Sequence, residues 1–302
     1  MAKRTRQSRT SDPVRAYAEA VTKGEIVAGP HVRAACARHL QDLEDGEARG
    51  LRWDVKAAAR ALGFFPDVLL LSEGQFEGRP FDLHPSQAFV VGSIFGWKRA
   101  DGTRRFRRAY IEQGKGNGKS PLAGGIGLYG MMADQEPGAQ VYAAAAKMDQ
   151  ARILFQDAVN MVRQSPALEA RITPSGVNPV FNLADLKTGS FFRPVGRDTG
   201  KTGSGLRPHF VLLDELHEHP NRDTLEMLER GFKFRRQPLI LMITNSGSDR
   251  NSVCWEEHEH AVAVAHGEVQ DDTTFSYVCA LDDRMIRWTI RLAGPRQTRS
   301  SG

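Results

Sequence analysis

The sequence predicts an α/β fold with a mostly parallel central sheet and a helical N-terminal region. From Pro85 onward, short apolar segments typical of strands alternate with longer segments of helical spacing, and this order favours parallel strands with helices on both faces. Two of the strand segments, 209–215 and 238–245, are nearly all apolar, as central strands covered on both faces tend to be. Between residues 13 and 62, in contrast, apolar residues recur at helical spacing.

Length, composition and charge exclude several classes of protein. The chain has 302 residues, of which 40% are hydrophobic, enough for one large domain or two modest ones. No apolar run approaches the ~18 residues of a membrane span, and the start lacks a secretory signal, so we expect a cytosolic protein. Cys36, Cys254 and Cys279 lie far apart, which indicates neither a disulfide framework nor a zinc ribbon. The net charge of +5 permits a nucleic-acid partner without requiring one.

The first part of the chain predicts a disordered start followed by helices. Residues 1–12 are basic and polar, and we expect them to be disordered. Residues 13–84 predict a helical region, since three segments show apolar residues at three- and four-residue spacing. These segments are 16–21, 31–44 and 53–62. Asp12 followed by Pro13 is typical of a helix start, with an N-cap side chain and proline at the first helical position.

Residues 85–283 predict the α/β domain, and 284–302 predict an aberrant or disordered tail. Strands are expected at 106–112, 140–146, 190–195, 209–215 and 238–245. Helices are expected at 120–134, 148–164 and 223–232. The tail is rich in arginine and has no acidic residue, unlike the rest of the chain.

The first expected strand leads into a glycine-rich stretch, EQGKGNGKS at 112–120. Glycines allow consecutive backbone N–H groups to point inward around phosphates, and the start of the following helix adds positive potential. We therefore predict a phosphate-binding loop here. Its backbone would come from Gly114, Lys115, Gly116, Asn117 and Gly118.

The residues that follow these glycines complete the pattern, with one irregularity. Lys119 would reach the β and γ phosphates, and the Ser120 hydroxyl would bind Mg²⁺. Gln113 stands where the strict G-x-x-x-x-G-K-[ST] pattern has its first glycine. A glycine-rich turn that contains GKS by chance is the alternative, so a second motif must decide.

That second motif is the acidic pair Asp214 and Glu215, at the end of an apolar strand. In enzymes with a phosphate loop, an acid in this place holds Mg²⁺, and an adjacent glutamate can orient and deprotonate the attacking water. Taken alone, the pair could instead serve the start of a helix.

A third motif, Thr244 and Asn245, ends the next strand along the chain. Open α/β sheets bind ligands at the carboxyl ends of their strands, so these side chains would face the γ-phosphate. The same letters also favour a turn. The three motifs in this order predict hydrolysis of a nucleoside triphosphate, and Glu215 favours turnover over binding alone.

With these motifs, the chain resembles the ATPase part of the large terminase subunit of tailed bacteriophages, the motor that packages DNA into empty capsids. The resemblance runs from about residue 12 to 283. It includes PSQAFVVGSIFGWKRADGTRRFRRAYIEQGKGNGKS, YAAAAKMDQARILF, GLRPHFVLLDELHEH and LILMITNSGS. It implies a P-loop NTPase fold of the additional-strand, RecA-like class that uses ATP and Mg²⁺.

The resemblance also implies roles that the residues alone do not. Lys115 occupies the position of a basic residue, usually arginine, that could stabilise the γ-phosphate; a solvated loop lysine remains the alternative. Gln87 matches the position where such motors recognise adenine, and its amide offers a donor and an acceptor; it could equally be a surface glutamine. Thr244 and Asn245 would couple hydrolysis to DNA movement.

The implied partners are double-stranded DNA, the portal protein and the small terminase subunit. The resemblance also implies that the chain forms a homo-oligomeric ring on the portal. We expect it in the cytoplasm of the infected bacterium, with no membrane partner. Basic residues at 104–108 and 233–236 could meet DNA phosphates, or could be solvated faces or subunit contacts. Cys254, His258 and His260 predict a polar helix start rather than a metal site.

The family's large subunits continue into an RNase H-like nuclease, and we expect no nuclease activity from these residues. A helicase-like nucleic-acid translocase and a truncated, non-catalytic assembly remnant are the alternative functions.

Overall fold

The computed structural model describes residues 12–72, 74–196 and 205–282. The expected tail at 284–302 and the expected disordered start, apart from Asp12, lie outside these residues. The strands of the main sheet are β3 (Arg108–Glu112), β4 (Gln140–Ala145), β5 (Thr173–Ser175), β6 (Asn182–Asp185), β7 (Ser190–Gly196), β8 (Phe210–Asp214), β9 (Leu239–Thr244) and β10 (Thr274–Val278).

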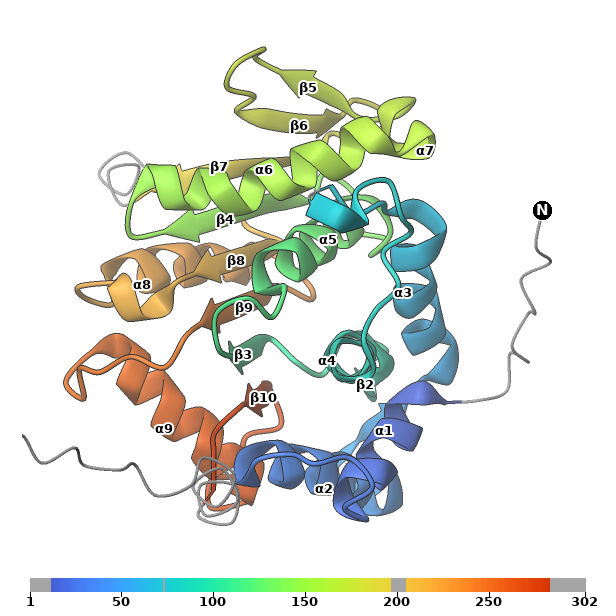
Figure 1. Ribbon diagram of the computed structural model, residues 1–302, viewed down its shortest axis with the longest axis vertical. Helices are drawn as coiled ribbons and strands as arrows, with labels where there is room; N and C mark the ends of the chain where they lie inside the picture. Colours follow the sequence, from blue (N-terminus) through green and yellow to red (C-terminus); the bar gives the residue numbers. More distant parts are fainter. Residues whose placement is uncertain (1–11, 73, 197–204, 283–302) are drawn as a thin grey trace, which may run out of the picture.

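These strands form one eight-stranded sheet in the order β10-β3-β9-β8-β4-β7-β6-β5 (Figure 1). All pairs from β10 to β7 are parallel, and β6 and β5 extend the sheet in antiparallel fashion. The mostly parallel sheet that the strand and helix alternation predicts is therefore confirmed.

Helices cover both faces of the sheet. They are α1 (Pro13–Thr22), α2 (Pro30–Asp45), α3 (Val55–Val68), α4 (Pro85–Gly96), α5 (Lys119–Met132), α6 (Met148–Gln164), α7 (Pro166–Glu169), α8 (Asp223–Arg230) and α9 (Val253–His266). Alternate residues of β8 face opposite ways, as the strand period requires. Phe210 and Leu212 join the hydrophobic cluster that includes α5 and α6, and Val211 and Leu213 join the one that includes α8 and α9.

The N-terminal region forms its predicted helices and is part of the same core as the sheet. Asp12 accepts hydrogen bonds from the N–H groups of Val14 and Arg15, as expected of an N-cap. One correction is needed, because the short strand β1 (Leu51–Trp53) interrupts the helical region and pairs antiparallel with β2 (Trp97–Arg99). The Tyr17 and Tyr277 hydroxyls lie 2.8 Å apart and join α1 to β10.

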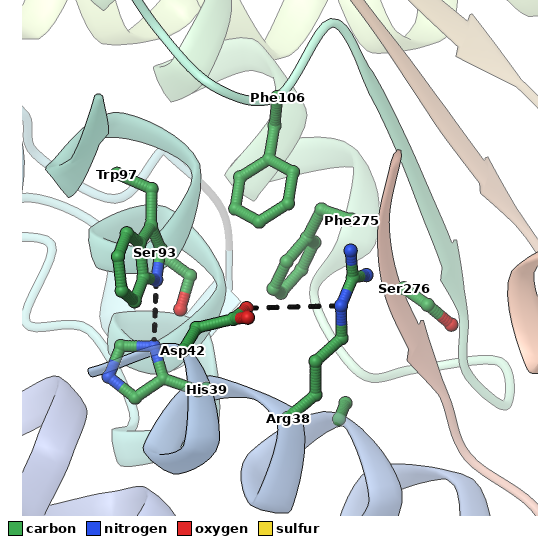
Figure 2. Close-up of a pocket in the computed structure, with 9 residues that line it drawn as sticks. Arg38, His39, Asp42, Ser93, Trp97, Phe106, Phe275 and Ser276 are labelled. Atoms are coloured by element: carbon green, nitrogen blue, oxygen red, sulfur yellow. Dashed lines mark hydrogen bonds and ion pairs between the residues drawn. The ribbon is translucent and has the colours of Figure 1, made fainter. Parts of the chain in front are cut away.

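Figure 2 shows where this region meets the edge of the sheet. The Trp97 indole N–H donates to His39 Nδ1 at 3.0 Å, and Arg38 lies beside Asp42 (Figure 2). The cavity between them is about 20 Å³, room for one water molecule. None of the predicted nucleotide-site residues lines this cavity. It lies where the N-terminal region packs against the sheet and is not the predicted nucleotide site. Within the described ranges, no helix is both long and apolar enough to cross a membrane.

Candidate functional site

The three predicted motifs meet at the carboxyl edge of neighbouring strands. β3 ends at Glu112, β9 at Thr244 and β8 at Asp214. Glu112 is paired with Thr244, and Asp214 is paired with Ile243. The phosphate loop, the acidic pair and the Thr244–Asn245 segment therefore lie side by side, as expected where parallel strands end together.

The glycine-rich loop has the backbone that the sequence predicts. Gly116 and Gly118 have φ of +85° and +68°, a region that glycine adopts without steric cost. Asn117 Nδ2 donates to the carbonyl oxygen of Gly114 at 2.9 Å and closes the loop. Gly118 is the N-cap of α5, and among the described residues no side chain caps this helix. Its first N–H groups can therefore serve an anion.

Lys119 points back into the loop and is 8% exposed. Its Nζ donates to the carbonyl oxygens of Gln113 and Gly114 at 2.9 and 3.1 Å and to Asn245 Oδ1 at 2.8 Å. Burial lowers the pKa of the Lys119 ammonium, while Glu215 and Asp214 act in the opposite direction. The ammonium is thus held where phosphate oxygens can replace the present acceptors.

Asp214 is 6% exposed and lies beside Ser120 at the start of α5. Burial, and then the charge of Glu215, raises the pKa of Asp214 to about 6, although hydrogen bonds from the Glu215 N–H and Ser120 oppose the rise. A buried carboxylate next to a hydroxyl and a second carboxylate is an all-oxygen donor set, the type that Mg²⁺ takes. These residues fit a divalent cation.

Glu215 follows directly and has a strained backbone. Its φ of +48° and ψ of +54° are left-handed, which is uncommon for a residue other than glycine, asparagine or aspartate and costs about 1–3 kcal/mol. Asn245 Nδ2 donates to both carboxylate oxygens, at 3.2 and 3.4 Å, and His217 Nδ1 lies 3.3 Å from Oε2. The turn directs the carboxylate toward Asn245 and Lys119.

Thr244 and Asn245 have different positions in the site. Thr244 is fully buried; its hydroxyl donates to the Asn245 carbonyl oxygen at 2.9 Å and lies 3.0 Å from His217 Nδ1. Asn245 instead reaches into the site and joins Lys119 to Glu215 through its two amide atoms.

Gln87, beside the loop, and Lys115, within it, lie outside this hydrogen-bonded chain. Gln87 Oε1 accepts from the N–H of His84 at 3.0 Å and completes the capping box of α4. Its Nε2 would lie 3.4 Å from a Cβ placed on Gly118, so the amide borders the end of the loop. Lys115 is exposed at the loop tip.

The structure adds residues that the sequence motifs do not assign. Glu112 is 4% exposed although it directly precedes the loop. Ser246 Oγ donates to it at 2.7 Å, and His258 Nδ1 lies 2.8 Å from it. An acidic residue at the end of a buried strand was the available signal for Glu112. His217 and His258 come from other elements, and the sequence holds no local signal for them.

In the first basic cluster, at 104–108, two arginines are buried and cannot form part of a DNA-binding face. Arg104 and Arg105 are 0% and 1% exposed. Arg104 pairs with Asp134 at 3.0 Å, and Arg105 pairs with Asp42 at 2.6 Å. For these two arginines the DNA-contact hypothesis is wrong, because the charges are neutralised inside the protein.

The other basic residues are partly buried, paired or exposed. Arg107 is partly buried. Arg108 pairs with Glu229 and Glu257, and Arg235 with Glu136. Lys233 and Arg236 are exposed.

The histidines of α9 have different partners. His258 contacts Glu112, whereas His260 lies 3.1 Å from Asp271. Across the described residues, no group of three or more His, Cys, Asp or Glu side chains could hold a metal ion.

Comparison with known proteins gives a consistent result. Residues 85–262 match a family model described as the ATPase domain of the terminase large subunit. A curated relative, the terminase large subunit of Enterobacteria phage HK97, is 26% identical over 195 residues. That match covers 63% of this chain and 37% of the relative, so the chain spans well under half of the relative's length.

Two solved structures share the fold. The crystal structure of the HK97 large terminase matches with a TM-score of 0.59 and 23% identity, over 73% of this chain and 43% of that one. The large terminase ATPase domain of Thermus phage P74-26 matches with a TM-score of 0.51 and 19% identity, over 75% of this chain and 95% of that one. The predicted P-loop, RecA-like fold class is confirmed by these likenesses.

Proposed function

The chain belongs to the family of terminase large-subunit ATPase domains, and from this premise we propose that its site binds ATP with Mg²⁺ and hydrolyses it. The observation that carries the proposal is the hydrogen-bonded chain from Lys119 through Asn245 to Glu215. It links the phosphate loop to the acid that would activate water. A loop that only binds nucleotide needs no such link.

Binding would begin at the glycine-rich loop. The N–H groups of Gly114, Lys115, Gly116, Asn117 and Gly118 and of the first turn of α5 would surround the phosphates. Lys119 would exchange the carbonyl oxygens of its own loop for phosphate oxygens. Gln87, which borders Gly118, would contact adenine, and the exposed Lys115 would approach the γ-phosphate.

Ser120 and Asp214 would hold Mg²⁺ between the loop and β8. The cation would neutralise charge that develops on the phosphate oxygens. Asp214 is suited to this role because its buried carboxylate lies next to that of Glu215. A bound cation would offset the repulsion between the two negative charges.

Glu215 would then act on the attacking water. It would accept a proton from the water as the water oxygen bonds to the γ-phosphorus and the bond to the bridging oxygen of ADP breaks. Asn245 would hold the Glu215 carboxylate in the correct direction, and Thr244 would fix the backbone of that segment. Thr244 and Asn245 would also sense the loss of phosphate and pass it on as movement.

At the scale of the virus, we propose that this chain is the ATP-driven part of a motor that moves double-stranded DNA into the procapsid. Residues 85–283 would form the ATPase domain, with 13–84 packed on it. In the cytoplasm of the infected bacterium, copies would act as a ring on the portal protein and receive DNA with the small terminase subunit. The family match favours this motor over a helicase-like translocase or a non-catalytic remnant.

Steady-state ATP hydrolysis with Mg²⁺ tests the site. We expect Lys119→Ala to lower kcat/KM by about 100-fold or more, because it removes the charge that meets the phosphates. Removal of Mg²⁺ with a chelator should abolish turnover in the wild type. Arg236→Ala, at an exposed residue outside the site, is the matched control and should hydrolyse ATP like the wild type. Equal rates for wild type and Lys119→Ala would refute the proposal.

A further inference from the structure

A buried carboxylate with no role in the proposed function lies directly behind the phosphate loop. Glu112 ends β3, two positions before Gly114, and is 4% exposed. Its backbone carbonyl accepts from the N–H of Cys279, after β10. The Glu112 side chain is thus buried at the carboxyl end of β3, directly before the loop.

Three groups from different elements hold the Glu112 carboxylate. Ser246 Oγ donates to Oε1 at 2.7 Å, Tyr110 OH donates to Oε2 at 2.8 Å, and His258 Nδ1 lies 2.8 Å from Oε2. Burial by itself would raise the pKa of Glu112, but the hydrogen bonds from His258, Ser246 and Tyr110 outweigh it and lower that pKa. Glu112 is thus a charged acceptor, and hydrogen bonds to charged groups are the stronger kind.

One of these three bonds, from Ser246, connects Glu112 to the candidate nucleotide site. Ser246 directly follows Asn245, the residue that joins Lys119 to Glu215. Two consecutive residues after β9 are therefore bound on opposite sides, Asn245 to the hydrolytic groups and Ser246 to Glu112. Tyr110, in contrast, lies within β3. Besides Glu112, its hydroxyl lies 3.5 Å from Cys254 Sγ, which is 3.7 Å from the Thr244 hydroxyl, so its contacts with the end of β9 pass through other side chains.

We infer that Glu112 is a positioning residue for hydrolysis, which acts through Ser246 to hold Asn245 in place beside Glu215. This inference rests on the proposed function. When Lys119 turns to the phosphates, Asn245 loses its bond to the ammonium. The Ser246 bond to Glu112 then acts together with the Thr244 hydroxyl to keep this segment, and the Glu215 carboxylate bound to Asn245, in the geometry for attack on water.

The experiment compares two variants that each remove one hydrogen bond to the same carboxylate. We expect Ser246→Ala to lower kcat by about 10-fold or more with KM for ATP nearly unchanged, because ATP binding does not use this contact. Tyr110→Phe should keep kcat within about two-fold, although it also breaks a bond to Glu112. Ser246→Thr retains the hydroxyl, and Ser246 is exposed enough to accept a methyl group, so it should restore kcat.

Hydrogen exchange of the amides at 244–248 gives a readout that needs no turnover. Exchange there should be faster in Ser246→Ala than in wild type and unchanged in Tyr110→Phe. If wild type fails to hydrolyse ATP but exchange follows this pattern, the proposed function fails and the positioning contact stands. If Ser246→Ala and Tyr110→Phe have equal kcat, or equal exchange at 244–248, the inference is overturned.

Discussion

At the scale of single residues, two adjacent carboxylates share a largely buried place at the end of β8. Burial, followed by the charge of Glu215, raises the pKa of Asp214 from an ordinary 3.8 to about 6. A raised pKa means that the protonated form is favoured by folding. The contribution of Asp214 to stability is therefore fully present below about pH 4 and is lost as the pH rises through about 6.

Asp214→Asn should accordingly stabilise the nucleotide-free protein at neutral pH. We expect a gain of up to about 3 kcal/mol in the free energy of unfolding at pH 8, which shrinks toward zero below pH 4. Urea unfolding at several pH values without Mg²⁺ measures it. Asp149→Asn, at an exposed residue of α6, is the control and should show no such pH-dependent gain. An equal effect of the two substitutions would contradict the cause given for the raised pKa.

The sequence predicts which residues come together at this scale, but not how they are connected. Lys119, Asp214 and Asn245 follow from motif order, since strand ends of a parallel sheet converge. The burial of Glu112 and its contacts depend on how the segment after β9, which holds Ser246, and α9, which holds His258, pack against the end of β3, and no local pattern records this. The roles proposed for Lys115 and Gln87 stay predictions.

At the scale of elements, α5 shows why a helix here contains several glycines. A Cβ placed on Gly127 would lie 2.7 Å from both Leu212 of β8 and Phe192 of β7, closer than real side chains pack. The glycine therefore lets α5 approach the sheet. Helix propensity, which would favour alanine by about 1 kcal/mol, is outweighed by this close contact.

Gly127→Ala should therefore destabilise the protein by about 1–3 kcal/mol, as insertion into a packed core does. The matched control is Gly63→Ala in α3, where a new Cβ would meet only the Asp67 carboxylate at 3.4 Å. That substitution should be neutral or stabilising by up to about 1 kcal/mol. Thermal unfolding of both variants gives the comparison, and greater stability of Gly127→Ala would refute the packing argument.

The elements that the sequence does not predict share a physical cause. They are α4, α7, β1, β2, β5, β6 and β10, which are short or lack clear periodicity. α4, PSQAFVVGSIFG, is buried nearly all round from Phe89 onward, so it has no polar face to reveal a helical period. β5 and β6 join the sheet by antiparallel pairing, which tertiary contacts rather than local propensity determine.

At the scale of the whole molecule, a buried ion-pair cluster joins the N-terminal region to the sheet. Arg105 pairs with Asp42 of α2 at 2.6 Å and with Asp272, just before β10, at 2.7 Å. Its guanidinium also lies over the rings of Trp97 and Phe106. Residues 13–84 and the sheet should therefore unfold as one unit.

Arg105→Ala should lower the stability of the entire domain by about 3 kcal/mol or more, because it leaves the buried Asp42 carboxylate less compensated. Arg15→Ala, which removes an exposed pair with Glu19, should have little effect. Far-ultraviolet circular dichroism and tryptophan fluorescence should report coincident transitions. Separate transitions for the two probes would contradict the single unit.

The arginines also show that a basic run in the sequence does not determine whether its side chains are exposed. RRFRR at 104–108 has the composition of a DNA-binding patch, yet its first two members are in the core. Whether a basic run faces solvent depends on which acids the fold brings near it, here Asp42 and Asp134 from distant segments. The fold class, in contrast, follows from alternation and motif order, which act along the chain.

Hydrolysis of bound ATP in a single turnover by wild type and Glu215→Gln shows whether Glu215 activates the attacking water. The amide keeps the shape of the side chain and its contact with Asn245 but cannot accept the proton from water. We predict that both proteins bind Mg-ATP with similar Kd, and that Glu215→Gln hydrolyses it about 100-fold more slowly or worse. Equal single-turnover rates would show that Glu215 does not activate water and would contradict the account.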